Sequence, residues 1–304
     1  MADLERIQTR LSNIQNVEPI LSALRTISLG SWQAALNQRS RVQTFGLQLT
    51  QLLPQLAPYV PHPSPQRFGR RSRKSHPAGG GKAIAVVVGS ERGLCGRFNT
   101  TVVEAFEDLV EEQNSTGVVV ELLALGNRVV RALKKTGHEP DASITLSLTK
   151  LPPFELAHRL TQTWLKRYET HEIDTVDLIY NTYQGIGRYE PAVARLLPPD
   201  LPPATPSDAA DSWSAPAIIE TDPTALYTRI IQQWAAVTLY GYLLDAATAE
   251  HSARYALMEG ATQNTSRLID ELTLALHSAR QQAITTEMQE LAAGAGLIGT
   301  GTSS

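Results

Sequence analysis

Apolar residues near the N-terminus repeat with the spacing of a long helix. The first of them alternate between three and four residues apart, at Leu4, Ile7, Leu11 and Ile14. The repeat continues less regularly to residue 28, and charged residues occupy the other positions of the first turns. A repeat of 3.5 residues is typical of a left-handed coiled coil. The pattern predicts a helix over residues 2–53, and a helix packed on a globular core is the alternative reading of the stripe.

The C-terminal part of the chain predicts a second, longer helix. All 18 prolines lie at or before Pro223, and only Gly241 and Gly260 interrupt the run from there to Gly294. Asp222 suits the N-cap position. A proline at the first helical position costs no hydrogen bond, because an amide there has no partner within the helix. This helix would be roughly 110 Å long at 1.5 Å per residue. No globular domain can bury that length, so we expect a second long helix or a surrounding assembly beside it.

Pro19 lies inside the N-terminal helix. A proline in a helix interior removes one hydrogen bond and clashes with the carbonyl four residues earlier, which costs about 3 kcal/mol. The sequence therefore predicts either a kink near residues 16–19 or a break of the helix there.

Between the two helices the hydrophobic pattern changes to that of an α/β domain. Residues 83–89 form a continuous apolar run, typical of a buried parallel strand. Further strands are predicted at 118–126, 143–148 and 175–183, helices at 100–113, 127–137 and 153–170, and antiparallel edge strands at 189–198 and 215–220. This alternation predicts a Rossmann-like layer with a largely parallel sheet. The expected fold class is thus α/β with long helices, in which an antiparallel coiled coil of the terminal helices accompanies a Rossmann-like domain.

Five segments follow from these patterns. They are an N-terminal coiled-coil helix (1–55), a linker rich in Pro, Gly and Arg (56–81), the α/β domain (82–220), the long C-terminal helix (221–298) and a tail (299–304). The linker contains RFGRRSRK at 67–74, with five positive charges. This stretch is either a patch for an acidic partner or a solvated loop.

Composition excludes several classes of protein. The 304 residues carry 27 Lys and Arg against 30 Asp and Glu, a net charge of −3, which gives no reason to expect nucleic acid as a partner. A single cysteine, Cys95, excludes an internal disulfide and suits a reducing compartment. The N-terminus lacks the apolar region of a secretory signal. The sequence contains no run of about eighteen apolar residues, so we expect no direct insertion into a membrane.

The turn from Gly89 to Gly96 is the strongest candidate for chemistry. It lies between a strand and a helix, where dinucleotide enzymes bind pyrophosphate, but its glycine spacing matches neither phosphate-binding motif. We interpret the glycines as requirements of a tight turn. Cys95 suits a buried structural role better than that of a nucleophile, because no His–Asp pattern accompanies it. We expect no catalytic residue, no cofactor and no metal site, and a dinucleotide-dependent enzyme is the weakest hypothesis.

Several strings resemble the gamma subunit of F-type ATP synthases, and together they cover nearly the whole chain. They are residues 4–27, SERGLCGRFN (90–99), ALGNRVV (124–130), DLIYNTY (177–183), RLLP (195–198), AEHSAR (249–254), IDELTL (269–274) and ARQQAITTEMQEL (279–291). The chain departs from the family at 18–25, where a lysine-rich stretch is usual and only Arg25 is positive. The regulatory cysteine pair of photosynthetic versions is absent, and the turn is also similar to that of alternate, often sodium-linked enzymes.

The resemblance implies a non-catalytic central rotor shaft. Its partners would be the alpha and beta subunits in a hexamer, the epsilon subunit and the membrane c-ring, on the cytoplasmic face of the plasma or thylakoid membrane. The positions that match rotor contacts with the catalytic subunits are Arg280, Gln281, Thr285 and Glu287, with Arg25 on the N-terminal helix. Two alternatives stay open: these side chains are solvated, or the chain is a gamma-like paralogue or coiled-coil adaptor that does not rotate.

Overall fold

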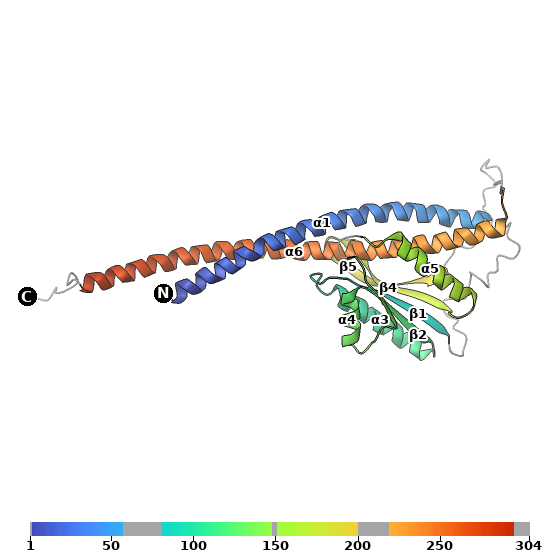
Figure 1. The fold of residues 1–304 in the computed structure, drawn as a ribbon, viewed down its shortest axis with the longest axis horizontal. Coiled ribbons are helices and arrows are strands. Elements are labelled where there is room, and N and C mark those ends of the chain that lie inside the picture. The colour runs from blue at the N-terminus through green and yellow to red at the C-terminus, as the bar shows by residue number, and fades with distance from the viewer. Residues whose placement is uncertain (1, 57–80, 148–150, 200–218, 295–304) are drawn as a thin grey trace, which may run out of the picture. The chain divides into compact units, whose positions relative to one another are not determined.

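The computed structural model describes residues 2–56, 81–147, 151–199 and 219–294, and it has a long helix at each end of the sequence and an α/β sheet domain formed by the segment between them (Figure 1). Helix α1 (Ala2–Leu56) has 55 residues and helix α6 (Pro223–Gly294) has 72. The long helices predicted at both ends are therefore present. The linker segment 67–74 lies outside the described residues, as do residues 295–298 of the predicted C-terminal helix and the tail, 299–304.

The start of α6 is fixed by its N-cap, as the sequence predicted. The carboxylate of Asp222 accepts hydrogen bonds from the backbone amides of Thr224 (3.3 Å) and Ala225 (3.0 Å). Two of the amides that lack partners in the first helical turn are thereby satisfied.

Helix α1 is continuous through residues 16–19, so the predicted alternative of a break at Pro19 is wrong. The side chain of Pro19 is exposed, so it takes no part in the packing of α1 against α6. The helix also passes position 54 and ends at Leu56, three residues beyond the predicted end.

The middle of the chain forms one five-stranded sheet in the order β3-β2-β1-β4-β5. Its elements are β1 (Lys82–Val88), α3 (Phe98–Ser115), β2 (Val119–Leu125), α4 (Asn127–Lys135), β3 (Ala142–Ile144), α5 (Phe154–Glu169), β4 (Thr175–Gly185) and β5 (Arg188–Leu197). Strands β1 to β4 are parallel and β5 pairs antiparallel with β4. This confirms a mixed α/β class with a largely parallel sheet and an antiparallel edge strand. The order β3-β2-β1-β4 is that of the first four strands of a Rossmann fold.

Two of the predicted strands differ from the structure. The predicted strand 143–148 ends at Ile144, where its partner β2 also ends at Leu125. Of the predicted strand 215–220, residues 215–218 lie outside the described part, and residues 219 and 220 are not in a strand.

Both faces of the sheet are covered, which explains the continuous apolar run of β1. On one face, Ile84, Val86 and Val88 pack with residues of α5 and α6. On the other face, Ala85 and Val87 pack with α3 and α4. A strand buried on both faces has no position for a polar side chain. Helix α6 contributes Leu239, Leu243 and Leu244 to the first of these cores, so its early turns belong to the domain core.

The chain divides into two compact units, residues 28–255 and the pair of segments 1–27 and 256–304. Within residues 28–255, α1 and α6 run antiparallel and approach each other through reciprocal small and branched residues. A Cβ atom on Gly46 would contact Val237 at 3.5 Å, and one on Gly241 would contact Val42 at 3.9 Å. Each glycine thus lies opposite a valine of the other helix, and an alanine at either position would make an ordinary van der Waals contact with that valine.

Within the other unit, the N-terminal apolar stripe packs against the end of α6. Leu11, Leu272 and Leu276 form a buried cluster, and the residues packed against it are Leu4, Ile7, Ile14, Leu268 and Ile269. Arg25 Nη1 of α1 donates a hydrogen bond to Glu259 Oε2 of α6 at 2.9 Å. A later residue of α1 thus contacts an earlier residue of α6, as expected for antiparallel helices. The stripe therefore packs on the other terminal helix, and the handedness of any supercoil stays a prediction.

None of the helices in the described part of the chain has both the length and the apolar character needed to cross a bilayer.

Replacing Pro19 tests whether α1 is continuous in solution. In a continuous helix, Pro19→Ala restores a hydrogen bond and removes a clash, so the free energy of unfolding should rise by up to about 3 kcal/mol. Pro19→Gly is the control, and its gain should be smaller by about 1 kcal/mol because glycine is a poor helix former. Urea or thermal unfolding of the full chain measures both values. No gain for Pro19→Ala would mean that the helix is interrupted.

Candidate functional site

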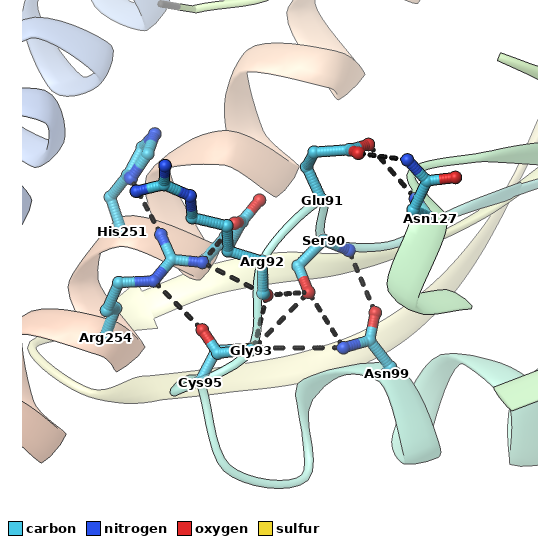
Figure 2. Close-up of polar contacts among 10 residues, drawn as sticks. Ser90, Glu91, Arg92, Gly93, Cys95, Asn99, Asn127, His251 and Arg254 are labelled. Atoms are coloured by element: carbon cyan, nitrogen blue, oxygen red, sulfur yellow. Dashed lines mark hydrogen bonds and ion pairs between the residues drawn. The ribbon is translucent and has the colours of Figure 1, made fainter. Parts of the chain in front are cut away.

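The turn after β1, residues 89–97, lies at the edge of the sheet where the parallel strands end. Ligands bind at this edge in open α/β sheets. Here the turn is closed by its own side chains, as Figure 2 shows. The Ser90 amide donates to Asn99 Oδ1 (2.9 Å), Asn99 Nδ2 donates to Ser90 Oγ (2.8 Å), and this hydroxyl donates to the carbonyl of Arg92 (2.7 Å). These groups are occupied and do not project into an open site.

Cys95 is buried beneath the turn. Its Sγ lies 3.5 Å from Ser90 Oγ, and its side chain packs with Phe98, Ala249 and Ala253. Burial raises the pKa of the Cys95 thiol above its ordinary value. A thiol with a raised pKa stays protonated near neutral pH and is a poor nucleophile. The prediction of a buried structural cysteine is confirmed.

Glycines allow the loops after β1 and β2 to pack into each other. A Cβ atom on Gly89 would lie 2.4 Å from Val129 Cβ. Gly126 has a φ of +103°, and a Cβ there would lie 2.8 Å from the carbonyl oxygen of Ser90. No other residue type fits at either position. Gly89 thus has a structural role, but it serves close packing against Val129 and not the tight turn that the sequence predicted.

The carboxylate of Glu91 occupies the N-terminus of α4. Its Oε2 accepts hydrogen bonds from the amides of Asn127 and Leu146, both at 3.1 Å, and its Oε1 accepts one from Asn127 Nδ2. A helix N-terminus attracts anions because its amides are unpaired and its dipole is positive there. An internal carboxylate therefore satisfies the N-terminus of the helix after β2, whereas the phosphate site of a Rossmann fold lies at the helix after β1.

The space beside this turn is small. A cavity of about 30 Å³ is lined by the turn, the loop after β3 and α6, including Glu91, Glu250 and Arg254. That volume suits a water molecule, whereas ligand pockets measure about 300 Å³ or more. Within the described ranges, no group of three or more His, Cys, Asp and Glu side chains is arranged to hold a metal ion. The geometry argues against the dinucleotide-enzyme hypothesis.

Helix α6 is fastened to the turn by Arg254. This side chain, 9% exposed, forms an ion pair with Glu250 at 2.5 Å and donates to the carbonyl oxygens of Gly93 (3.3 Å) and Arg92 (3.4 Å), as Figure 2 shows in part. Burial raises the pKa of Glu250, and the positive charge of Arg254 opposes that rise. Burial and Arg254 lower the pKa of His251 to about 4, so His251 is neutral and its Nδ1 accepts from Arg254 Nη1 at 3.3 Å.

A second fastening joins α6 to the β4–β5 hairpin. Ser252 Oγ accepts from the amide of Gly187 (2.8 Å) and donates to the carbonyl of Gly185 (3.2 Å). Two turns earlier, Asp245 accepts a hydrogen bond from the amide of Tyr183 (3.3 Å) and forms an ion pair with Arg39 of α1 (2.9 Å). Together with Arg254, these contacts connect one stretch of α6 to two loops of the sheet domain.

Comparisons with known proteins identify the family. A family model described as ATP synthase matches residues 3–296. The ATP synthase gamma chain of Granulibacter bethesdensis is 30% identical over 304 residues, which cover 97% of this chain and 99% of the relative. This chain belongs to the ATP synthase gamma-chain family. The gamma chain of Geotalea daltonii is 28% identical, with 97% and 98% of the two chains covered. As a gamma chain, it is a non-catalytic rotor subunit of the rotary ATP synthase.

Solved structures share the gamma fold. A chain of the Euglena gracilis mitochondrial ATP synthase aligns with a TM-score of 0.58 at 15% identity and covers 100% of this chain and 99% of that one. A chain of the central stalk and c-ring of the Tetrahymena thermophila mitochondrial enzyme aligns with a TM-score of 0.55 at 19% identity, covering 80% of this chain and 99% of that one. At these identities the likeness supports the fold.

The residues predicted as rotor contacts lie on the last part of α6 and on α1. Arg280, Gln281, Thr285 and Glu287 are all exposed. Thr285 Oγ1 donates to the carbonyl of Gln281 at 2.8 Å, and neither Arg280 nor Glu287 forms an ion pair with another described residue. Arg25 pairs with Glu259 of α6. The structure does not bring Arg25 into one cluster with the other four.

Sequence reasoning missed Glu91, Glu250, Ser252 and Arg254. All four lie in strings that carried the family resemblance, but Glu91, Ser252 and Arg254 bind groups that are distant along the chain. Arg254 contacts residues more than 160 positions away. The signal was the pair of opposite charges four residues apart, Glu250 and Arg254, in one helix.

The role of Glu91 is testable by truncation. Glu91→Ala removes three hydrogen bonds to a charged acceptor at the N-terminus of α4, and the free energy of unfolding should fall by about 1–2 kcal/mol. Glu91→Gln keeps an acceptor without the charge and should lose less. Urea unfolding of the full chain gives both values. Equal stability of the alanine variant and the parent chain would contradict the role.

Removing Arg254 leaves Glu250 largely buried without its partner. Arg254→Ala should lower the free energy of unfolding by about 3 kcal/mol at pH 7. The loss should shrink toward pH 4.5. The folded-state pKa of Glu250 is raised, so folding favours its protonated form, and the cost of its charge grows as pH rises above the unfolded pKa. The control E250Q/R254M buries no charge and should lose less. A loss independent of pH would mean that Glu250 is solvated.

Proposed function

We propose that this gamma chain is a shaft that turns inside a hexamer of alpha and beta subunits. The observation that carries the proposal is the exposed end of α6. Large apolar side chains there are open to solvent, with Leu274 at 74%, Ile284 at 58%, Met288 at 66% and Leu291 at 68% exposed. A helix end of this composition gains stability from packing, so it requires a surrounding surface. The hexamer supplies that surface.

The two terminal helices would act as one stiff rod. The three-and-four spacing of Leu4, Ile7 and Leu11 and the antiparallel contacts of α1 with α6 support a left-handed coiled coil. Two helices that pack along their length resist bending and twisting better than one.

The sheet domain would receive torque from the membrane c-ring and, with the epsilon subunit, hold the shaft there. The fastenings at Asp245, Ser252 and Arg254 support this route, because they join α6 to two loops of the sheet domain through hydrogen bonds and ion pairs. Torque on the sheet domain would reach α6 through these contacts. In this arrangement the chain is a peripheral part of the complex at the cytoplasmic face of the plasma or thylakoid membrane.

The shaft would define discrete angular positions through its polar contacts. Arg280 and Glu287 are exposed and have no ion-pair partner among the described residues, so partners on the hexamer can bind them. The charge-assisted hydrogen bonds that Arg280 and Glu287 would form are directional. Hydrogen bonds from the neighbouring side chains of Gln281 and Thr285 would be directional as well. An asymmetric shaft that contacts three catalytic sites differently biases each toward a different state. No feature of the fold or of the related proteins favours the adaptor alternative.

Co-expression with the alpha and beta subunits of the same organism tests the function. A tagged gamma chain should purify with a hexamer that hydrolyses ATP, and a bead on the shaft should rotate during hydrolysis. A hexamer that assembles without this chain, or rotation that does not accompany hydrolysis, would overturn the proposal.

The rotor contacts are tested by Arg280→Ala and Glu287→Ala. Both side chains are exposed, so each variant should fold with the melting temperature of the parent chain. In the assembled complex each should change ATP hydrolysis and ion-driven synthesis together, by about tenfold for the loss of one charge-assisted contact of 1–2 kcal/mol. Gln282→Ala, at an exposed neutral position, is the control. Unaltered turnover in both charge variants would show that these side chains are solvated.

A further inference from the structure

His251 lies in the contact between α6 and the turn after β1. It is 9% exposed, and its Nδ1 lies 3.3 Å from Arg254 Nη1 (Figure 2). A guanidinium group donates hydrogen bonds and accepts none, so Nδ1 is the acceptor and the neutral ring carries its proton on Nε2. The imidazole therefore stabilises Arg254 only while the ring is neutral.

A proton on Nδ1 would reverse this contact. The ring would present a donor to the donor of Arg254, and two positive charges would face each other at hydrogen-bond distance. Arg254 is also the side chain that donates to the carbonyl oxygens of Gly93 and Arg92. The repulsion would therefore act on the group that fastens α6 to the turn.

The carboxylates near His251 already have partners. Glu250 and Glu91 line the same small cavity as His251, as does the positive side chain of Arg92. Glu250 pairs with Arg254, and Glu91 accepts hydrogen bonds from two backbone amides. A protonated imidazole would thus have to compete with existing contacts for either carboxylate.

The other elements near His251 supply no compensating charge. On the side of α1, Arg39 pairs with Asp245, six residues before His251, and residues 28–38 of α1 carry no charge. Among its described residues, the loop after β3 contributes only uncharged side chains to the cavity. Uptake of a proton at this position is therefore paid for within the contact itself.

We propose that His251 is an acid-sensitive switch: when its Nδ1 takes up a proton, Arg254 leaves the turn and residues 249–254 of α6, called here the α6 contact segment, open. The switch belongs to the fold and does not depend on the proposed function. Under that function, acid would loosen the connection between the sheet domain and the shaft.

The direction of the pH dependence follows from the two forms of His251. Burial and Arg254 lower the pKa of His251 from 6.5 to about 4 in the closed form, whereas the open form exposes the ring. Protons therefore favour opening as the pH falls from 6.5 to 4, and the switch is silent above that range. Glu250 acts in the opposite direction, because burial raises its pKa and the closed form favours its protonated state. The test must separate the two residues.

Cys95 reports the opening of the α6 contact segment. It is the single cysteine of the chain, and it is buried against Ala249 and Ala253 of this segment. Opening should expose its Sγ to 4,4′-dithiodipyridine, a disulfide that reacts with thiols in neutral and in weakly acidic solution. The labelling rate of the folded full chain, divided by the rate of the same chain unfolded in urea at the same pH, gives the population of the open form.

The test compares the parent chain with His251→Asn. The amide oxygen of asparagine can accept from Arg254 near the position of Nδ1, and the amide does not titrate. Between pH 7.5 and pH 5, the ratio of the parent's corrected rate to that of His251→Asn should rise about thirtyfold, as expected for a pKa of about 4 in the closed form and 6.5 in the open form. Glu250 is present in both chains, so its contribution cancels in this ratio.

His171→Asn is the matched control. His171 is an exposed histidine outside this contact, and asparagine tolerates its φ of +57°. This variant should keep the pH dependence of the parent. If it instead loses the same pH dependence as His251→Asn, the assignment to His251 is wrong.

Two further outcomes would overturn the switch. The first is a ratio of parent to His251→Asn that stays constant with pH. The second comes from NMR of the full chain with ¹⁵N-labelled histidine, which also decides if His251→Asn does not fold. His251 should show the Nε2–H tautomer and bind a proton at a lower pH than the exposed histidines, and titration together with them contradicts the proposal. Neither measurement involves rotation, so failure here leaves the proposed function untouched.

Discussion

The length of α6 is the constraint on which the rest of the structure depends. A helix of 72 residues is too long for this chain to bury, so different parts of it are stabilised in different ways. Its early turns form part of the sheet-domain core through Leu239 and Leu243, and Val42 of α1 lies opposite Gly241 beside them. Residues 268–276 pack against the N-terminal stripe of α1. Beyond them nearly every side chain is exposed, which leaves the last turns dependent on a partner.

Apolar packing alone would hold α6 on the sheet without fixing its register. A helix that slides by one turn presents similar aliphatic side chains to the same strands. The polar fastenings remove this freedom, since Arg254 must reach the carbonyls of Arg92 and Gly93 while Ser252 bonds the β4–β5 hairpin. Burying Glu250 with Arg254 adds little net stability, because desolvation of two charges offsets most of their attraction. Specifying one register is the better explanation for this pair in a subunit that transmits torque.

The sequence predicted the fold better than the site, for a physical reason. Helices and strands follow from local periodicity, so the two long helices and the alternation of the middle segment were predictable. The predicted break at Pro19 was wrong because packing of one helix on another can outweigh the local free-energy cost of a proline at an exposed position. The strand predicted at 143–148 ends early because its partner β2 ends at Leu125, and the amide of Leu146 bonds Glu91 instead. The roles of Glu91 and Arg254 depend on partners far along the chain, which no local pattern reveals.

The edge of the sheet at which related folds bind ligands is used here to bind the chain's own helix. The amide of Asn127 at the start of α4 binds the carboxylate of Glu91, which comes from the turn after β1. A carboxylate on the same chain loses far less translational freedom than a free ligand on binding, so Glu91 satisfies these amides without an external anion. Filling that site also orders the turn that Arg254 reaches from α6. The same irregular glycine pattern that argued against nucleotide binding thus marks the place where the sheet domain holds the shaft.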